Sequence, residues 1–178
     1  MNLFIGRGKI DIVKAFNDYN KIIYGYILVR VNFKKEIAED LTQEVFIKVL
    51  MNAKKFDRKK GNLKTWIFTI ARNTLIDKYR QKIYTVDSNE KTSSLDRIAA
   101  QSDENKNVDE VLLMDYIKSK LPRLNAKERE LITLRYVNDL SLQEMGSILK
   151  IKHSNLKMAV SRALKKLSEL VNENEKNN

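Results

Sequence analysis

The stretch that decides the fold is Ser141-Leu-Gln-Glu-Met-Gly-Ser-Ile-Leu-Lys-Ile-Lys-His-Ser-Asn-Leu-Lys-Met-Ala-Val-Ser-Arg-Ala-Leu-Lys-Lys-Leu167. Its apolar residues recur every three or four positions, which is typical of amphipathic helices. Ser141 followed by Glu144 is a capping-box pattern, so we expect a short helix at 142–149. A tight turn is expected at 150–153, and Ser154 is expected to cap a last helix at 155–173. Two helices joined by a tight turn are typical of the helix-turn-helix motif.

The two faces of this helix pair differ in chemistry. The short helix is expected to point Met145, Ile148 and Leu149 inward, and the last helix is expected to point inward Leu156, Val160, Ala163, Leu164 and Leu167. A helix of this size fits the major groove of DNA, where its first turns reach base edges and its basic residues meet phosphates. The alternative is an ordinary surface helix with a solvated basic face. If the helix binds DNA, the contacts are expected to come from its outer face, which carries Asn155, Lys157, Met158, Ser161, Arg162, Lys165 and Lys166.

The rest of the chain also has a helical period. Helices are expected within 9–32, 35–55, 63–82 and 108–120, with a loop at 57–62 in which Gly61 makes the turn and Asn62 caps the next helix. Residues 83–107 are polar without a sustained apolar period, apart from a short helical piece near 95–100, and they predict a flexible acidic linker. The expected fold is therefore all-α, with no strand, as two small domains at 10–82 and 108–173.

Composition limits the partners. The net charge of +11 favours a polyanion, with nucleic acid first and an anionic membrane surface second, although a basic chain can also simply be soluble. The chain has no Cys and a single His, so it predicts neither a disulfide nor a metal site. No apolar run is long enough to insert into a bilayer, and no signal-peptide pattern begins the sequence, so a cytoplasmic location is expected. The sequence carries no recognisable catalytic or phosphate-binding motif, so neither enzyme activity nor a cofactor is expected.

Two surfaces stand out in the first domain. Asp40, Gln43, Glu44 and Ile47 share one helix face opposite an apolar stripe, which suits either docking to a protein or simple solvation. Further along, basic residues of the 57–62 loop precede a helix carrying Trp66. Interleaved basic and aromatic groups can hold single-stranded DNA, but such aromatic residues also commonly belong to a core.

Taken together, the two domains resemble the sigma-70 family, and in particular its extracytoplasmic-function group. The stretch at 38–50 is similar to the part of region two that grips the clamp helices of RNA polymerase. The pattern at 56–77 is similar to the segment that opens and reads the minus-ten element, and 121–136 with the helix-turn-helix is similar to region four, which reads the minus-thirty-five element. The order, spacing and total length also fit this group.

The resemblance implies a sigma factor that directs promoter-specific initiation, with core RNA polymerase (clamp helices and flap), promoter DNA and an anti-sigma factor as partners. It implies that the polymerase core is contacted by Asp40, Gln43, Glu44, Ile47 and Lys48. The melted minus-ten strand is expected to lie along Lys59, Lys60, Asn62, Lys64, Thr65, Trp66, Thr69, Arg72 and Asn73. The minus-thirty-five element is expected to contact Ser154, Asn155, Lys157, Met158, Ser161, Arg162, Lys165 and Lys166.

Two positions depart from the family pattern. Lys150 stands at a turn position where the family often has Gly, which implies a left-handed residue with a strain of roughly 1 kcal/mol. Ala159 stands where the family often has an Arg that contacts DNA. Two other functions remain open on the residues alone. One is a conventional helix-turn-helix regulator that binds duplex without polymerase, and the other is a nucleic-acid enzyme, which would need clustered catalytic groups.

Overall fold

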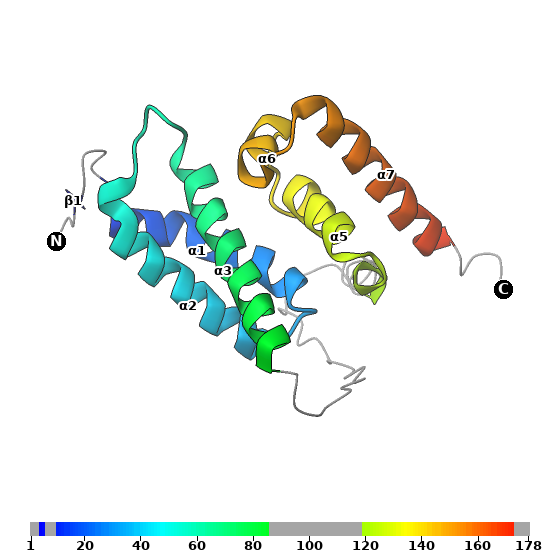
Figure 1. The fold of residues 1–178 in the computed structure, drawn as a ribbon, viewed down its shortest axis with the longest axis horizontal. Coiled ribbons are helices and arrows are strands. Elements are labelled where there is room, and N and C mark those ends of the chain that lie inside the picture. Colours follow the sequence, from blue (N-terminus) through cyan, green and yellow to red (C-terminus); the bar gives the residue numbers. More distant parts are fainter. Residues whose placement is uncertain (1–3, 6–9, 86–118, 173–178) are drawn as a thin grey trace, which may run out of the picture.

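The computed structural model describes residues 4–5, 10–85 and 119–172. The first domain, here the first lobe, has three long helices and one short turn (Figure 1). These elements are α1 (Ile12–Arg30), α2 (Lys35–Asn52), the 3-10 turn η1 (Ala53–Lys55) and α3 (Leu63–Thr85). Both α1 and α3 pack against α2, so the three helices form a small bundle.

The second lobe follows the undescribed stretch at 86–118. Its elements are the 3-10 turn η2 (Leu121–Arg123), α5 (Ala126–Ile132), the π-helical turn η3 (Thr133–Val137), α6 (Leu142–Leu149) and α7 (His153–Asn172). In Figure 1, α7 runs along the outer side of this lobe. It packs against α5 and α6. The all-α expectation is therefore confirmed, with two helical lobes.

Two capping boxes are present, and the sequence pattern predicts each of them, since Asn125 is followed by Glu128 and Ser141 by Glu144. The Asn125 side chain accepts the Glu128 amide at 2.9 Å, and the Glu128 carboxylate accepts the Asn125 amide at 2.9 Å. The Ser141 hydroxyl accepts the Glu144 amide at 3.2 Å, and the Glu144 carboxylate accepts the Ser141 amide at 2.9 Å. Each box satisfies amides that have no partner within their own helix, which explains why α5 and α6 begin where they do.

Three sequence expectations about element boundaries are wrong. A two-residue antiparallel ladder joins β1 (Phe4–Ile5) to β2 (Ile10–Asp11), although no strand was expected. The last helix begins at His153, so Ser154 lies in its first turn and does not precede it. The third helix continues to Thr85, past its predicted end at 82. The flexible linker beyond it, the helical piece at 95–100 and all but the end of the helix at 108–120 fall outside the described residues.

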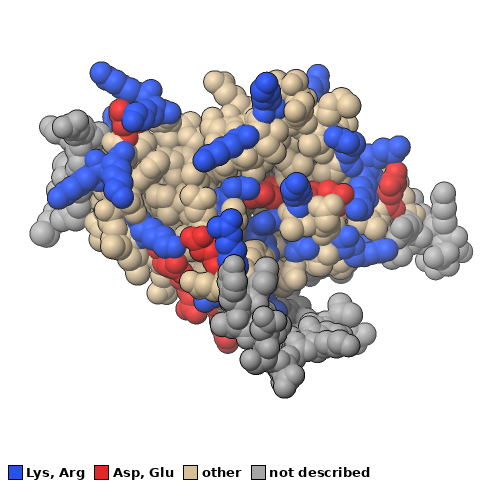
Figure 2. Space-filling view, viewed as in Figure 1, with Lys and Arg blue, Asp and Glu red and all other residues tan. Residues whose placement is uncertain are grey.

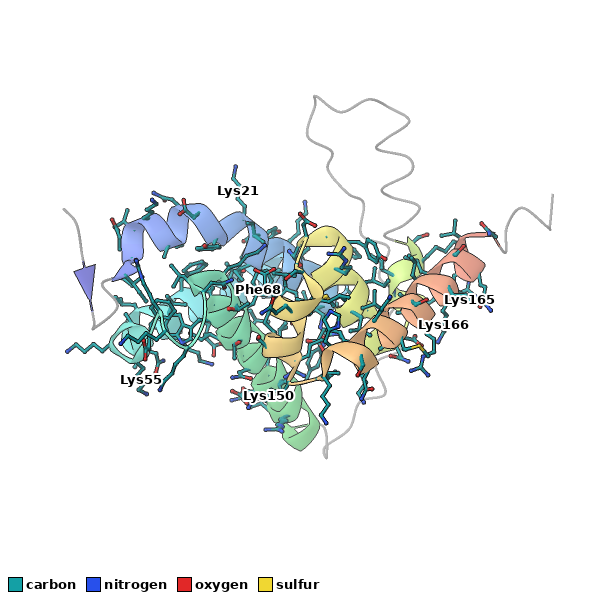
Figure 3. All side chains as sticks on the ribbon, turned by 90° about the horizontal axis from the view of Figure 1, so that it is seen from above. Lys21, Lys55, Phe68, Lys150, Lys165 and Lys166 are labelled. Carbon is teal, nitrogen blue, oxygen red and sulfur yellow. The ribbon has the colours of Figure 1, made fainter. Side chains whose placement is uncertain are left out.

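In each lobe, the apolar side chains along one face of each helix pack together into a core. In the first lobe Tyr26 and Phe68 are fully buried and meet edge to face, with ring centroids 5.5 Å apart. Figure 3 places Phe68 in the middle of the packed helices. In α7 the expected stripe is partly wrong, because Leu164 is 41% exposed whereas Leu170 is only 8% exposed. The 156–160–163–167–170 spacing keeps one face inward, and Leu164 lies beside it.

The two lobes also pack against one another. Helix α3 contacts α6, and α1 contacts both α5 and η3 (Figure 1). Asn138 directly follows the π-helical turn η3, and its side-chain amide donates to the Ile22 carbonyl of α1 at 3.2 Å. The lobes therefore form one packed body of described residues, a contact that the helical pattern did not predict.

Candidate nucleic-acid interface

The turn between α6 and α7 has the geometry that a helix-turn-helix requires. Lys150 adopts the left-handed conformation (φ 57°, ψ 41°) and ends α6, as expected from its place in the motif. Figure 3 shows Lys150 at this turn. A Cβ on Gly146 would lie 3.1 Å from the Ile151 carbonyl oxygen, so glycine allows the chain after the turn to approach α6 closely. Met145, Ile148 and Leu149 are buried beneath the turn, as predicted.

Helix α7 presents its predicted outer face to solvent. The exposed members of the predicted set are Ser154, Asn155, Lys157, Met158, Ser161, Arg162 and Lys165. Lys166 differs from the others because its ammonium donates to both carboxylate oxygens of Glu128, at 2.9 and 3.1 Å. The two neighbouring lysines therefore differ in environment, since the Lys165 side chain is 80% exposed and that of Lys166 is 44% exposed.

The predicted protein-docking face lies on α2. Asp40, Gln43 and Ile47 are exposed, while Glu44 is partly exposed. Lys48 is held within the lobe because its ammonium pairs with Glu44 at 2.7 Å and donates to the Thr74 hydroxyl of α3 at 3.2 Å. Ile47 is 56% exposed, and the exposed Leu50 and Met51 follow it by three and four residues on the same helix face. Leu50 and Met51 were not among the residues predicted for this face, although their helical spacing from Ile47 indicates that they lie on it.

The basic loop is fastened to the start of α3. The Asn62 side-chain oxygen accepts the Thr65 amide at 2.7 Å, which confirms Asn62 as the cap of this helix. The Thr65 hydroxyl donates to the same oxygen at 2.7 Å and to the Asn62 carbonyl at 3.0 Å. Thr65 is buried, so it shapes the loop and does not present a free hydroxyl to a ligand.

Trp66 borders a cavity on this face. It is half-buried, between the two roles that the sequence left open for it, and its ring centroid lies 5.2 Å from that of Phe56. The cavity has a volume of about 310 Å³ and is lined by Lys60, Asn62, Thr69 and other residues of the loop and α3. Lys55 and Ser147 also line it and were not predicted. Lys55 could have been predicted from the sequence, because it directly precedes the basic loop. Ser147 could not, because it comes from α6 in the other lobe.

Apart from Thr65, Trp66 and Thr69, the predicted minus-ten residues either point to solvent or contact the second lobe. Lys59, Lys60 and Asn73 are exposed. Three others contact the second lobe: the Asn62 amide donates to Glu144 at 3.3 Å, the Lys64 ammonium donates to the Asn138 carbonyl at 3.4 Å, and Arg72 pairs with Glu130 at 3.1 Å. The structure thus brings the predicted side chains together along one face, and it also covers part of that face.

The surface charge follows the two predicted DNA-binding segments. In Figure 2 basic side chains gather over the loop between α2 and α3, at upper left, and over the second lobe at right. Figure 3 shows Lys55 and the Lys165–Lys166 pair near opposite ends of the molecule. Such an arrangement can contact a nucleic acid at two separated places.

Two carboxylates of the second lobe have lowered pKa values. Burial acts to raise the pKa of Glu144, but the amide and hydroxyl of Ser141, with the Asn62 amide, hold it below its ordinary value. For Glu128 burial acts in the same way, and the hydrogen bond from Lys166 lowers the pKa below its ordinary value. Burial and then the Glu130 carboxylate raise the pKa of Tyr26 well above its ordinary value, so its hydroxyl remains a donor.

Other classes of site receive no support from the described residues. Within 10–85 and 119–172, no three His, Cys, Asp or Glu side chains are grouped so that they could hold a metal ion. Among the same residues, no helix combines the length and apolar character that crossing a bilayer requires.

Comparisons with known proteins match both lobes. Residues 16–83 match the model of sigma-70 region 2, and residues 114–167 match that of sigma-70 region 4. The chain is 32% identical to the ECF RNA polymerase sigma factor SigM of Bacillus subtilis, over 92% of this chain and 96% of that protein. It is 33% identical to SigW of the same organism, over 70% of each chain.

Solved structures share the fold. The sigma factor RpoE of Bartonella quintana, in complex with the anti-sigma factor NepR, superposes with a TM-score of 0.75 at 24% identity, over 92% of this chain and 98% of that one. CnrH in complex with the cytosolic domain of CnrY gives a TM-score of 0.66 at 18% identity, over 91% and 88% of the chains. Both family models match, and the SigM likeness extends over 92% of the chain, so this protein belongs to the extracytoplasmic-function group of the sigma-70 family, as an RNA polymerase sigma factor that directs promoter-specific initiation and not an enzyme.

Proposed function

We propose that three separate surfaces of this protein bind core polymerase, the melted minus-ten strand and the minus-thirty-five duplex. The α2 face around Asp40, Gln43, Glu44, Ile47 and Lys48 binds the clamp helices of core polymerase. The basic loop and α3 bind the melted minus-ten strand. The start of α7 reads the minus-thirty-five duplex. These functions extend over the two domains proposed at 10–82 and 108–173.

The observation that carries the proposal is the exposed outer face of α7, held at the left-handed Lys150 turn. Seven of the eight predicted minus-thirty-five residues are exposed, from Ser154 to Lys165, while the opposite side of the helix is buried on α5 and α6. A helix presented in this way can enter the major groove, where Asn155 and Lys157 lie near its N-terminal end and reach bases or phosphates. The second lobe thus provides duplex binding that is separate from the α2 face.

The minus-ten assignment is supported by the combination of charge and a cavity. Lys59 and Lys60 are exposed on the loop, and the cavity beside Trp66 has room for part of an unstacked base. Basic groups that follow a backbone, next to an aromatic platform, are typical of single-strand binding. Strand opening would then be driven by binding energy, because capture of extruded bases stabilises the open form.

The decisive experiment is transcription in vitro with purified core polymerase and a promoter library. The sigma assignment predicts initiation from a specific set of promoters only when the protein is added. A conventional regulator would bind duplex promoter DNA without polymerase and would not confer initiation. An endonuclease would instead cleave DNA in the presence of a divalent metal ion.

The polymerase surface is tested separately. We expect Asp40→Asn to weaken core binding at least 5-fold and to leave duplex DNA binding unchanged, because Asp40 is exposed on α2, away from α7. Asp18→Asn is the matched control, since it makes the same change at an exposed residue of α1, outside the proposed face. Equal losses in the two variants would mean that net charge, and not the proposed face, determines core binding.

We also expect an anti-sigma partner and a cytoplasmic location. An anti-sigma protein is expected as a partner, because the two similar solved structures are complexes of sigma factors with NepR and CnrY. A protein that works on core polymerase and promoter DNA is also expected to act in the cytoplasm. Co-purification of a tagged chain from its own cells would test the partner.

A further inference from the structure

A second cavity borders the basic loop on the side of α1. It has a volume of about 770 Å³ and lies where β2 and the first turns of α1 meet the loop and the start of α3. Figure 1 shows the start of α1 and this loop at the same end of the first lobe. Phe56, Gly61 and Asn62 line both this cavity, here the α1 cavity, and the cavity beside Trp66. One short loop therefore forms a wall of two cavities, and the proposed function uses only the cavity beside Trp66.

The charges around the α1 cavity are balanced. Its basic side chains are Lys14 and Arg58, and its acidic side chains are Asp11 and Asp18. A third cavity along the loop, of about 520 Å³, is strongly basic, because it is lined by Phe56 and Asp57 together with Lys54, Lys55, Lys59 and Lys60. Clustered lysines attract backbone phosphates. The lysine-lined cavity therefore suits the backbone of a strand, and the α1 cavity suits a group without net charge, such as a base.

Arg58 gives the α1 cavity a means of recognising one particular base. Its side chain is exposed, and no described carboxylate pairs with its guanidinium. The planar guanidinium can donate two parallel hydrogen bonds, and the O6 and N7 atoms of guanine are the acceptor pair to which arginine most often donates in DNA recognition. Tyr19 also lines the cavity and is half-buried, so its ring offers an aromatic wall to an unstacked base. The α1 cavity thus combines room for a base, an aromatic wall and a pair of donors suited to guanine.

We propose that the α1 cavity takes up an extruded guanine of the promoter strand, and that Arg58 recognises this base by donating hydrogen bonds to its O6 and N7. This inference rests on the proposed binding of the minus-ten strand by the loop and α3. Arg58 was not among the residues predicted for that strand, and it becomes a specificity-determining residue. The strand backbone then follows the lysine-lined cavity, while separate bases enter the cavity beside Trp66 and the α1 cavity.

The test measures strand binding by the full-length chain assembled with core polymerase, with core polymerase alone as the reference. Anisotropy is recorded for a labelled twelve-nucleotide strand of dT, for the same strand with one central dG, and for a strand with 7-deaza-dG at that place. The 7-deaza base has a carbon in place of N7, so it keeps O6 and loses one of the two acceptors. The main variant is Arg58→Lys, which keeps the positive charge and loses the paired donors. Arg80→Lys is the matched control, because Arg80 is exposed on α3 and does not line the α1 cavity.

We expect the central dG to tighten binding by the wild-type assembly about 5-fold or more. This preference should be lost with 7-deaza-dG and in Arg58→Lys, and it should be kept in Arg80→Lys. The strand of dT alone should bind equally to all three proteins, because each carries the same charge. The inference is overturned if dG gives no preference, or if the preference survives either Arg58→Lys or the 7-deaza base. If the assembly binds the dT strand no more tightly than core polymerase alone, the minus-ten assignment itself fails, and this inference fails with it.

Discussion

The two neighbouring lysines of α7 should affect DNA binding and stability in opposite ways. Lys165 is 80% exposed and lies 3.9 Å from an exposed Glu169, so its ammonium is available to a phosphate. Lys166 is 44% exposed and donates two hydrogen bonds to Glu128 of α5. We therefore expect Lys165→Ala to weaken DNA binding, and Lys166→Ala to weaken the second lobe.

The magnitudes follow from the two environments. Each phosphate contact with duplex DNA contributes about 0.9 to the slope of log affinity against log salt concentration. Without Lys165 that slope should become shallower by about 0.9, which makes the loss of affinity between 50 and 200 mM salt about 3-fold smaller. The partly exposed pair of Lys166 with Glu128 is screened by solvent, so its loss should lower the free energy of unfolding by about 0.5–1 kcal/mol. The loss in Lys165→Ala should be about 0.3 kcal/mol or less.

Two measurements separate these effects. Fluorescence anisotropy of a promoter duplex at several salt concentrations gives the slope, and urea unfolding followed by circular dichroism gives the stability. Lys127→Ala is the matched control, because Lys127 is exposed on α5 and lies outside the predicted DNA-binding set. If Lys166→Ala flattens the slope as much as Lys165→Ala does, Lys166 must leave Glu128 to bind DNA and the reasoning fails. An unchanged slope in Lys165→Ala would remove that residue from the DNA-binding face.

Three further predictions concern the second lobe. Lys150→Gly should raise the free energy of unfolding by about 0.5–1 kcal/mol, because relief of the left-handed strain exceeds the added freedom of the unfolded chain; a lower urea midpoint would contradict this. Met145→Ala, at a fully buried position, should cost about 2–4 kcal/mol in the same urea assay. The lowered pKa values of Glu144 and Glu128 stabilise the lobe above the ordinary glutamate pKa of 4.5, and this stability is lost as the pH falls through the lowered values. Thermal melts from pH 6 to pH 3 should show that loss, and it should be smaller in Glu144→Gln.

Local features of the fold were predictable because they depend on neighbours in the sequence. The capping boxes at Asn125 and Ser141, the cap at Asn62 and the turn at Lys150 each depend on side chains within a few residues. The buried stripe of α6 follows from helical spacing alone. The exposure of most outer residues of α7 follows from the same rule.

The errors arise where distant contacts decide the outcome. Tyr26 and Glu130 are separated by 104 residues, and no helical period relates them. The engagement of Lys166 by Glu128 likewise depends on how α5 packs against α7. The family resemblance places Thr65 along the minus-ten strand, and it could not reveal that the Thr65 hydroxyl is used within the loop. The contact between the lobes was missed for the same reason, since it depends on packing across the whole chain.

The bonds between Asn62 and Thr65 have a consequence for how a strand would be held. They fix the junction of the loop with α3 through hydrogen bonds of 2.7 to 3.0 Å. Ordering a flexible segment during association lowers affinity, because conformational entropy is lost at that moment. A junction already fixed in the unbound protein avoids this loss, so the lysines of the loop can meet a strand from a defined starting position.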